Sequence, residues 1–128
     1  MKPPVWVLKE TLLALHEQLL AEFGGSAGIR DEGLLDSALA RPENLFAYGR
    51  PNVFDLAASY GFGLVKNHAF IDGNKRMGFA VAVMFLEMNG FRFAAAEADA
   101  TVRTLALSAG AMKEAEYAAW LKANSRRA

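Results

Sequence analysis

The sequence predicts a compact all-α fold, a helical bundle around one central buried helix, and two patterns support this prediction. Apolar residues recur at steps of three and four along most of the chain, as they do on one face of an amphipathic helix. Segments containing glycine or proline interrupt this periodicity and divide the chain into pieces of helical length. The piece from Lys75 to Met88 is apolar nearly all round, so we expect the other helices to enclose it.

Length and composition fit one domain that comprises residues 1–128. The hydrophobic fraction of 53% excludes a disordered chain, and the absence of cysteine excludes disulfides and thiolate metal sites. The longest strictly apolar stretch, Phe79 to Leu86, is too short to cross a bilayer, and the N-terminus does not read as a secretory signal. We therefore expect a cytoplasmic protein without a membrane partner. The net charge of zero argues against direct nucleic-acid binding.

Capping residues and helix-breaking residues set the expected boundaries. Asp31 is expected to cap the second helix, which stops before Pro42 because a residue preceding proline disfavours the helical conformation. Residues 44–51 then form a loop, and Asn52 with Asp55 caps the third helix. The expected helices span residues 5–23, 31–41, 52–67, 75–88, 98–109 and 113–123, with residues 91–93 as a short strand or an extended connector.

Residues 68–76 read His-Ala-Phe-Ile-Asp-Gly-Asn-Lys-Arg and are the richest in chemistry. Gly73 allows a sharp turn, and Asn74 is expected to be the N-cap of the central helix. The free N–H groups at the start of that helix lie at the positive end of its dipole. Lys75 and Arg76 add positive charge at the same place. Together these groups predict an anion hole that binds phosphate.

Asp72 and His68 complete the predicted site. Asp72 is the only carboxylate close to the anion hole, and one carboxylate with phosphate oxygens and water is enough to hold Mg²⁺ on a nucleotide. His68 is a candidate general base for a hydroxyl nucleophile. His16, on the first helix, has no acidic or glycine-rich neighbours and is assigned a structural role. The pattern is neither a P-loop nor a protein-kinase signature.

The motif in residues 68–76 resembles that of the Fic/Doc family, and its lysine, Lys75, places it with the Doc (death-on-curing) toxins. Residues 15–17, 23–25 and 29–39 are also similar to Doc-like proteins, so the likeness covers nearly the whole chain. The resemblance implies a small helical Fic fold with the motif in the loop before the central helix. It also implies a toxin that uses ATP and Mg²⁺ to phosphorylate a threonine of elongation factor Tu, which halts translation.

The resemblance also implies a role for each motif residue by its position. His68 would deprotonate the target hydroxyl, and Asp72 would hold Mg²⁺. The loop around Tyr48 would correspond to the flap that docks the target segment. The phosphate and the rest of the nucleotide would be bound by Gly73, Asn74, Lys75 and Arg76.

Three departures from the family pattern bear on the reaction. AMP-transferring Fic enzymes have glycine in place of Lys75 and a second arginine in place of Phe79, and both differences favour γ-phosphoryl transfer here. Gly73, however, is the Fic-like choice where the best-known Doc toxin has alanine, so a Fic-type AMP transferase is the first alternative. A catalytically silent module that binds antitoxin or nucleotide is the second.

The sequence also bears on inhibition. Many Fic enzymes contain an inhibitory helix with the pattern Ser/Thr-x-x-x-Glu-Gly/Asn, and this pattern is absent from the sequence. We therefore expect inhibition by a separate, Phd-like antitoxin whose helix fills a groove on the toxin.

Overall fold

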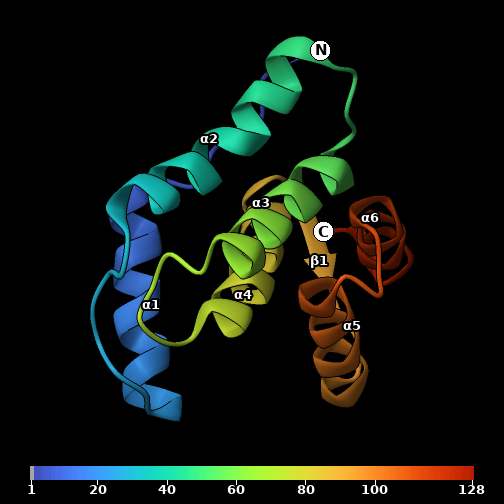
Figure 1. Ribbon diagram of the computed structural model, residues 1–128. Helices are drawn as coiled ribbons and strands as arrows, with labels where there is room; N and C mark the ends of the chain where they lie inside the picture. Colours follow the sequence, from blue (N-terminus) through green and yellow to red (C-terminus); the bar gives the residue numbers. More distant parts are fainter. Residues whose placement is uncertain (1) are drawn as a thin grey trace.

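The computed structural model describes residues 2–128 and has an all-α fold with a small two-stranded sheet (Figure 1). In chain order the elements are α1 (Lys9–Phe23), α2 (Glu32–Tyr48), α3 (Val53–Asn67), α4 (Asn74–Met88), β1 (Phe91–Phe93), α5 (Glu97–Ala109), α6 (Glu114–Ala123) and β2 (Ser125–Arg127). In the view of Figure 1, α3 and α4 occupy the middle of the molecule, with α1 to the left and α5 and α6 to the right, while α2 runs from the left to the top.

The pair formed by α3 and α4 is the centre of the core. The structure confirms the prediction that α4 is enclosed, since seven of its residues are buried; α3 buries ten. The two helices approach closely where Gly61 faces Gly78. A Cβ atom added to Gly78 would lie 3.0 Å from the carbonyl oxygen of Gly61 and 2.5 Å from Val65, so only glycine fits there. This close contact fixes the first half of α4 against the middle of α3.

Most helix boundaries agree with the sequence prediction. Asn52 and Asp55 form a capping box in which each side chain accepts the other's backbone N–H, at 2.8 and 2.9 Å. The glycine and asparagine stops after α1, α4 and α5 are also confirmed. One boundary is late: α1 begins at Lys9, four residues after the expected start at Val5.

The predicted end of α2 is wrong. This helix continues through Pro42 to Tyr48, so residues 44–48 are helical, and the connection to α3 is correspondingly short. An interior proline costs a helix about 3 kcal/mol. Here Pro42 is itself buried, and Phe46, one turn later, packs edge-on against the Trp6 ring at 5.7 Å. Tertiary packing of the second half of α2 therefore outweighs the local signal.

The short strand expected at residues 91–93 is confirmed as β1, and its partner was not predicted. β2 pairs with it in antiparallel register, with Arg92 opposite Arg126. The C-terminal segment thus returns to the end of α4. Across residues 2–128, none of the helices has both the length and the apolar character needed to cross a bilayer.

Candidate active site

The loop between α3 and α4 contains the residues that the sequence singled out. Residues 68–73 connect the two most buried helices. His68 closes α3 in the left-handed region, with φ 50° and ψ 48°, and is the one non-glycine residue of those described that has a positive φ. Such a backbone conformation costs on the order of 1–3 kcal/mol and persists only where the surroundings hold it. The contacts around His68 are therefore part of the site.

Residues 28–31 hold the first half of the loop in place through hydrogen bonds. The Arg30 side chain donates from Nε to the carbonyl of His68 at 2.7 Å and from Nη2 to that of Asn67 at 3.1 Å. The backbone N–H of Arg30 also donates to the carbonyl of Ala69 at 2.7 Å. One arginine thus satisfies the exposed carbonyls at the end of α3 and fixes the backbone of the proposed base. The sequence does not predict this role of Arg30, because the two carbonyls lie 38 and 37 residues further along the chain.

Asn74 closes the loop from the other end and requires a correction. The N-cap of α4 is Gly73, with φ 82°, and Asn74 is the first helical residue. The buried Asn74 side chain instead bonds both backbone groups of Phe70, accepting its N–H at 3.0 Å and donating to its carbonyl at 2.9 Å. The Asn74 side chain is therefore committed to holding the turn. A direct part in binding phosphate stays a prediction, and it would fall to the backbone N–H.

The start of α4 is electrostatically positive. Gly73 is left-handed and the following residue is helical, a sequence of conformations that turns successive backbone N–H groups into one concave anion-binding nest. The first turn contains no acidic residue, while Lys75 and Arg76 are both exposed there. The Arg76 guanidinium lies 4.4 Å from the centre of the Phe23 ring at the end of α1. The geometry is suited to an anion at the mouth of the nest.

The Asp72 carboxylate lies beside this nest in a fixed orientation. Its Oδ1 accepts the N–H of Gly73 at 2.9 Å, and its Oδ2 accepts the N–H of Ser26 at 3.2 Å. A Cβ atom on Gly25 would come within 2.9 Å of Oδ2, so glycine at position 25 leaves room for the carboxylate. Asp72 is exposed, and each oxygen keeps free lone pairs for a further ligand.

The side chains at this site could bind a metal ion only together with a phosphate group that supplies further oxygen ligands. Within residues 2–128 there is no cluster of three or more histidine, aspartate or glutamate side chains that could hold a cation. Mg²⁺ is commonly bound by one or two carboxylates together with substrate phosphates and water. Asp72 beside an anion nest matches that arrangement, and it does not match a stand-alone metal cage.

His16 lies directly beneath the loop, a position that its sequence neighbours do not predict. Its ring is 4% exposed and stacks on the Phe70 ring at 3.8 Å with an interplanar angle of 20°. Its Nε2 lies 2.9 Å from the backbone carbonyl oxygen of Asp72. Because a carbonyl can only accept, Nε2 carries the proton and donates it. The available signal was the spacing of His16 four residues after Leu12, on the buried face of α1.

The structure keeps the proposed catalytic side chains accessible. The imidazole of His68 is exposed, and within the part of the chain described it makes no hydrogen bond or salt bridge. The same holds for the ammonium group of Lys75. Four side chains of the motif are exposed to solvent, while hydrogen bonds hold the loop backbone in place. They are those of His68, Asp72, Lys75 and Arg76.

Tyr48 is not part of this cluster. It is the last residue of α2 and is 90% exposed. The opposite end of α2 is the one next to the motif loop, where the backbone N–H of Asp31 bonds Ala69. A helix of 17 residues is roughly 25 Å long. Tyr48, at the end of α2, therefore lies far from the loop, and its role in a substrate flap stays a prediction. In Figure 1 this end of α2 is at the top.

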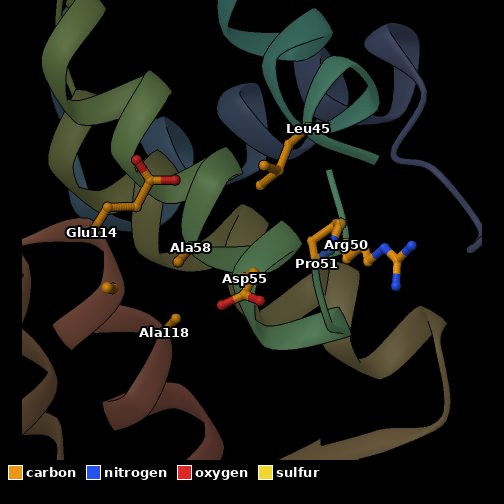
Figure 2. Close-up of a pocket in the computed structure, with 8 residues that line it drawn as sticks. Leu45, Arg50, Pro51, Asp55, Ala58, Glu114 and Ala118 are labelled. Carbon is orange, nitrogen blue, oxygen red and sulfur yellow. The ribbon is translucent and has the colours of Figure 1, made fainter. Parts of the chain in front are cut away.

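A surface hollow lies away from the motif loop, between the end of α2, the start of α3 and α6 (Figure 2). Its volume is about 410 Å³, and alanines from α3 and α6 form part of its wall. Its lining residues are Leu45, Arg50, Pro51, Asp55, Ala58, Glu114, Ala115 and Ala118. None of them belongs to the motif, so this hollow is not the site that the sequence predicts.

Comparison with known proteins relates the chain to one family. A family model described as the Fic/DOC family matches residues 6–86, which include the motif loop and nearly all of α4. A protein named Toxin Doc from Mycolicibacterium smegmatis is 47% identical over 76 residues, covering 57% of this chain and 58% of the relative. A protein named Protein kinase doc from Escherichia phage P1 is 34% identical over 82 residues, covering 63% of this chain and 65% of the relative. The match therefore spans about three fifths of the length of each relative.

Proposed function

This chain belongs to the Fic/DOC family, and from that premise we propose that it is the toxin of a toxin–antitoxin pair. Its activity is that of an Mg-ATP-dependent protein kinase that phosphorylates a threonine of elongation factor Tu and halts translation. This activity places its action in the cytoplasm. The similarity to proteins named Toxin Doc and Protein kinase doc supports the proposal. One observation carries the proposal. His68, Asp72, Lys75 and Arg76 are all exposed in or next to the loop at the positive end of α4, and hydrogen bonds hold the backbone of this loop in place.

Each group has one task in the transfer. The His68 imidazole accepts the proton of the threonine hydroxyl, so that the oxygen can attack phosphorus. When bound, Mg-ATP supplies the phosphoryl group, and ADP leaves. The Asp72 carboxylate would hold the metal ion of bound Mg-ATP. The N–H groups of the nest, with Lys75 and Arg76, hold the phosphate oxygens and oppose the charge that develops on them.

Phosphoryl transfer is favoured over AMP transfer by Lys75 and Phe79. Lys75 adds a cation next to the nest, where AMP-transferring relatives have glycine. Phe79, at the position where those enzymes have a second arginine, is turned into the core, with its ring 5.8 Å from Phe93 and 6.3 Å from Trp120. A second cation for a triphosphate is therefore missing at that position.

The experiment is label transfer to purified elongation factor Tu. We expect label from γ-labelled ATP and none from α-labelled ATP, and His68→Ala should abolish it. Because the His68 side chain is exposed and makes no hydrogen bond or salt bridge within residues 2–128, the variant should keep the circular dichroism and melting temperature of the wild type. Label from α-labelled ATP alone would establish AMP transfer instead. Full activity of His68→Ala would remove the proposed base.

Expression in bacteria separates the toxin from a silent binding module. The toxin should arrest growth, and co-expression of a Phd-like antitoxin should relieve the arrest by placing a helix in a groove of the toxin. Growth of the expressing cells at the normal rate would favour the non-enzymatic alternative.

A further inference from the structure

The Asp72–Gly73 peptide group is held by a side chain from a distant helix. His16, on α1, donates from Nε2 to the Asp72 carbonyl oxygen at 2.9 Å across 56 residues of sequence. The same ring stacks on Phe70. This peptide group leads into Gly73, the N-cap of α4, and its orientation decides whether an N–H or a carbonyl oxygen faces the Asp72 carboxylate beside the anion nest.

Gly73 makes the orientation of this peptide group easy to change, so a hydrogen bond is needed to hold it. A peptide's C=O and N–H point in opposite directions. Here the carbonyl points into the protein toward His16, and the Gly73 N–H points to the Asp72 carboxylate. Glycine occupies left-handed and right-handed conformations with similar ease, so a flip of the preceding peptide is sterically open to it. A flipped peptide would point the carbonyl oxygen where the Gly73 N–H now points, and it would repel the Asp72 carboxylate from its position beside the nest.

The burial of His16 argues against a purely space-filling role. An aromatic hydrocarbon would fill the space beside Phe70 equally well, whereas a buried polar ring is unfavourable unless it is hydrogen-bonded. The bond to Asp72 gives the ring nitrogen its partner.

Resting on the function proposed above, we propose that His16 is a positioning residue of the phosphate site. Its Nε2–H holds the Asp72 carbonyl away from the nest and keeps the Gly73 N–H directed at the Asp72 carboxylate, so that the carboxylate stays in place beside the nest with lone pairs free for Mg²⁺. His16 does not touch the nucleotide. It acts through the peptide that it orients.

Two substitutions separate the hydrogen bond from the packing. His16→Phe keeps a ring that can stack on Phe70 and removes the donor, while His16→Gln keeps an N–H at a similar reach and removes the ring. The probes are inorganic phosphate and a non-hydrolysable Mg-ATP analogue, titrated into the full chain. We expect His16→Phe to weaken both affinities about tenfold or more and His16→Gln to remain within about threefold of the wild type.

The amide resonance of Gly73 supplies a readout that a structural role would not move. In the ¹⁵N spectrum of the unliganded protein, His16→Phe should shift this resonance and speed its hydrogen exchange. Leu12→Ala is the matched control, because Leu12 is fully buried on the same helix. It should lower the melting temperature and leave both the Gly73 resonance and the phosphate affinity unchanged. If the phenylalanine variant does not fold, His16→Leu replaces it.

Wild-type phosphate affinity and an unshifted Gly73 resonance in His16→Phe would overturn the inference. So would equal losses in His16→Phe and His16→Gln, since the retained N–H donor of glutamine would then fail to preserve phosphate binding. The proposed function is judged separately. A wild-type protein that binds phosphate but labels no elongation factor Tu would refute the kinase and leave the role of His16 intact.

Discussion

Lys75 lies in the first turn of α4, where the helix dipole is positive, and its ammonium group has no partner within residues 2–128. A cation at this position is unfavourable in the absence of an anion, by about 0.3–1 kcal/mol at low ionic strength. We therefore predict that Lys75→Ala leaves the free energy of unfolding unchanged or raises it by up to about 1 kcal/mol, while it weakens Mg-nucleotide binding. Urea unfolding and nucleotide titration at low salt would measure the two effects.

Lys122 provides the matched control for Lys75. It lies in the last turn of α6, where the dipole favours a cation, so Lys122→Ala should lower stability by a few tenths of a kcal/mol. It should leave nucleotide binding unchanged. A clear loss of stability in Lys75→Ala with unchanged nucleotide affinity would mean that the lysine serves the fold and not a ligand.

The motif residues could be identified from the sequence because they are contiguous. Residues 68–76 combine a base, a carboxylate, a glycine and two cations within nine positions, and local reasoning also located the turn at Gly73. The support beneath them could not be found in this way. Arg30 reaches the loop across 38 residues and His16 across 56. Only the folded chain brings these side chains to the motif.

Helices whose ends are set by local chemistry were predicted well. The capping box before α3 and the glycine after α5 depend on backbone conformation within a few residues. The end of α2 depends instead on what its second half packs against, so the proline signal at Pro42 was misleading. For the same reason β2 was missed, since a strand of three residues is defined by its pairing with β1.

One ionic contact joins three helices and predicts a stability effect at the level of elements. Arg41 on α2 forms a two-pronged ion pair with Glu114 at the start of α6 and donates to the Ser59 hydroxyl of α3 at 3.0 Å. Its guanidinium also lies 4.6 Å from the centre of the Phe62 ring. Arg41→Ala would leave a half-buried carboxylate and a buried hydroxyl without this partner. We expect a loss of about 1–3 kcal/mol in the free energy of unfolding.

Arg103 is the control for Arg41, because its ion pair with Asp99 lies within one helix and is solvent-exposed. Arg103→Ala should cost no more than about 0.5 kcal/mol. Both variants should keep wild-type nucleotide affinity, since neither arginine contacts the motif loop. Equal costs for the two substitutions would contradict a connecting role for Arg41.

The molecule as a whole is tied together by two buried tyrosines. Tyr60 on α3 accepts the backbone N–H of Val7 at 3.1 Å, which fastens the N-terminal segment to the core. Tyr117 on α6 lies 3.0 Å from the hydroxyl of Thr104 on α5, which joins the two C-terminal helices. Burial disfavours the charged phenolate and raises the pKa of Tyr60 to about 12 and that of Tyr117 to about 12.

These raised pKa values predict how stability depends on alkaline pH. An unfolded tyrosine ionises near pH 10, so below that pH both states bind the proton and the full stability is present. Between pH 10 and 12 the unfolded chain releases protons that Tyr60 and Tyr117 retain in the fold. The free energy of unfolding should therefore fall, by up to about 1.4 kcal/mol per pH unit for each tyrosine. Urea unfolding at pH 9, 10 and 11 would measure this slope.

Tyr117→Phe tests the assignment of that slope. The variant loses its bond to Thr104 at every pH, which lowers stability by a constant amount, and it has no phenol to ionise. Its loss of stability between pH 10 and 11 should consequently be smaller than that of the wild type, and Tyr60→Phe should behave in the same way. If both variants kept the wild-type slope, other groups would be responsible for the alkaline loss, and the buried phenols would not be the source of the proton linkage.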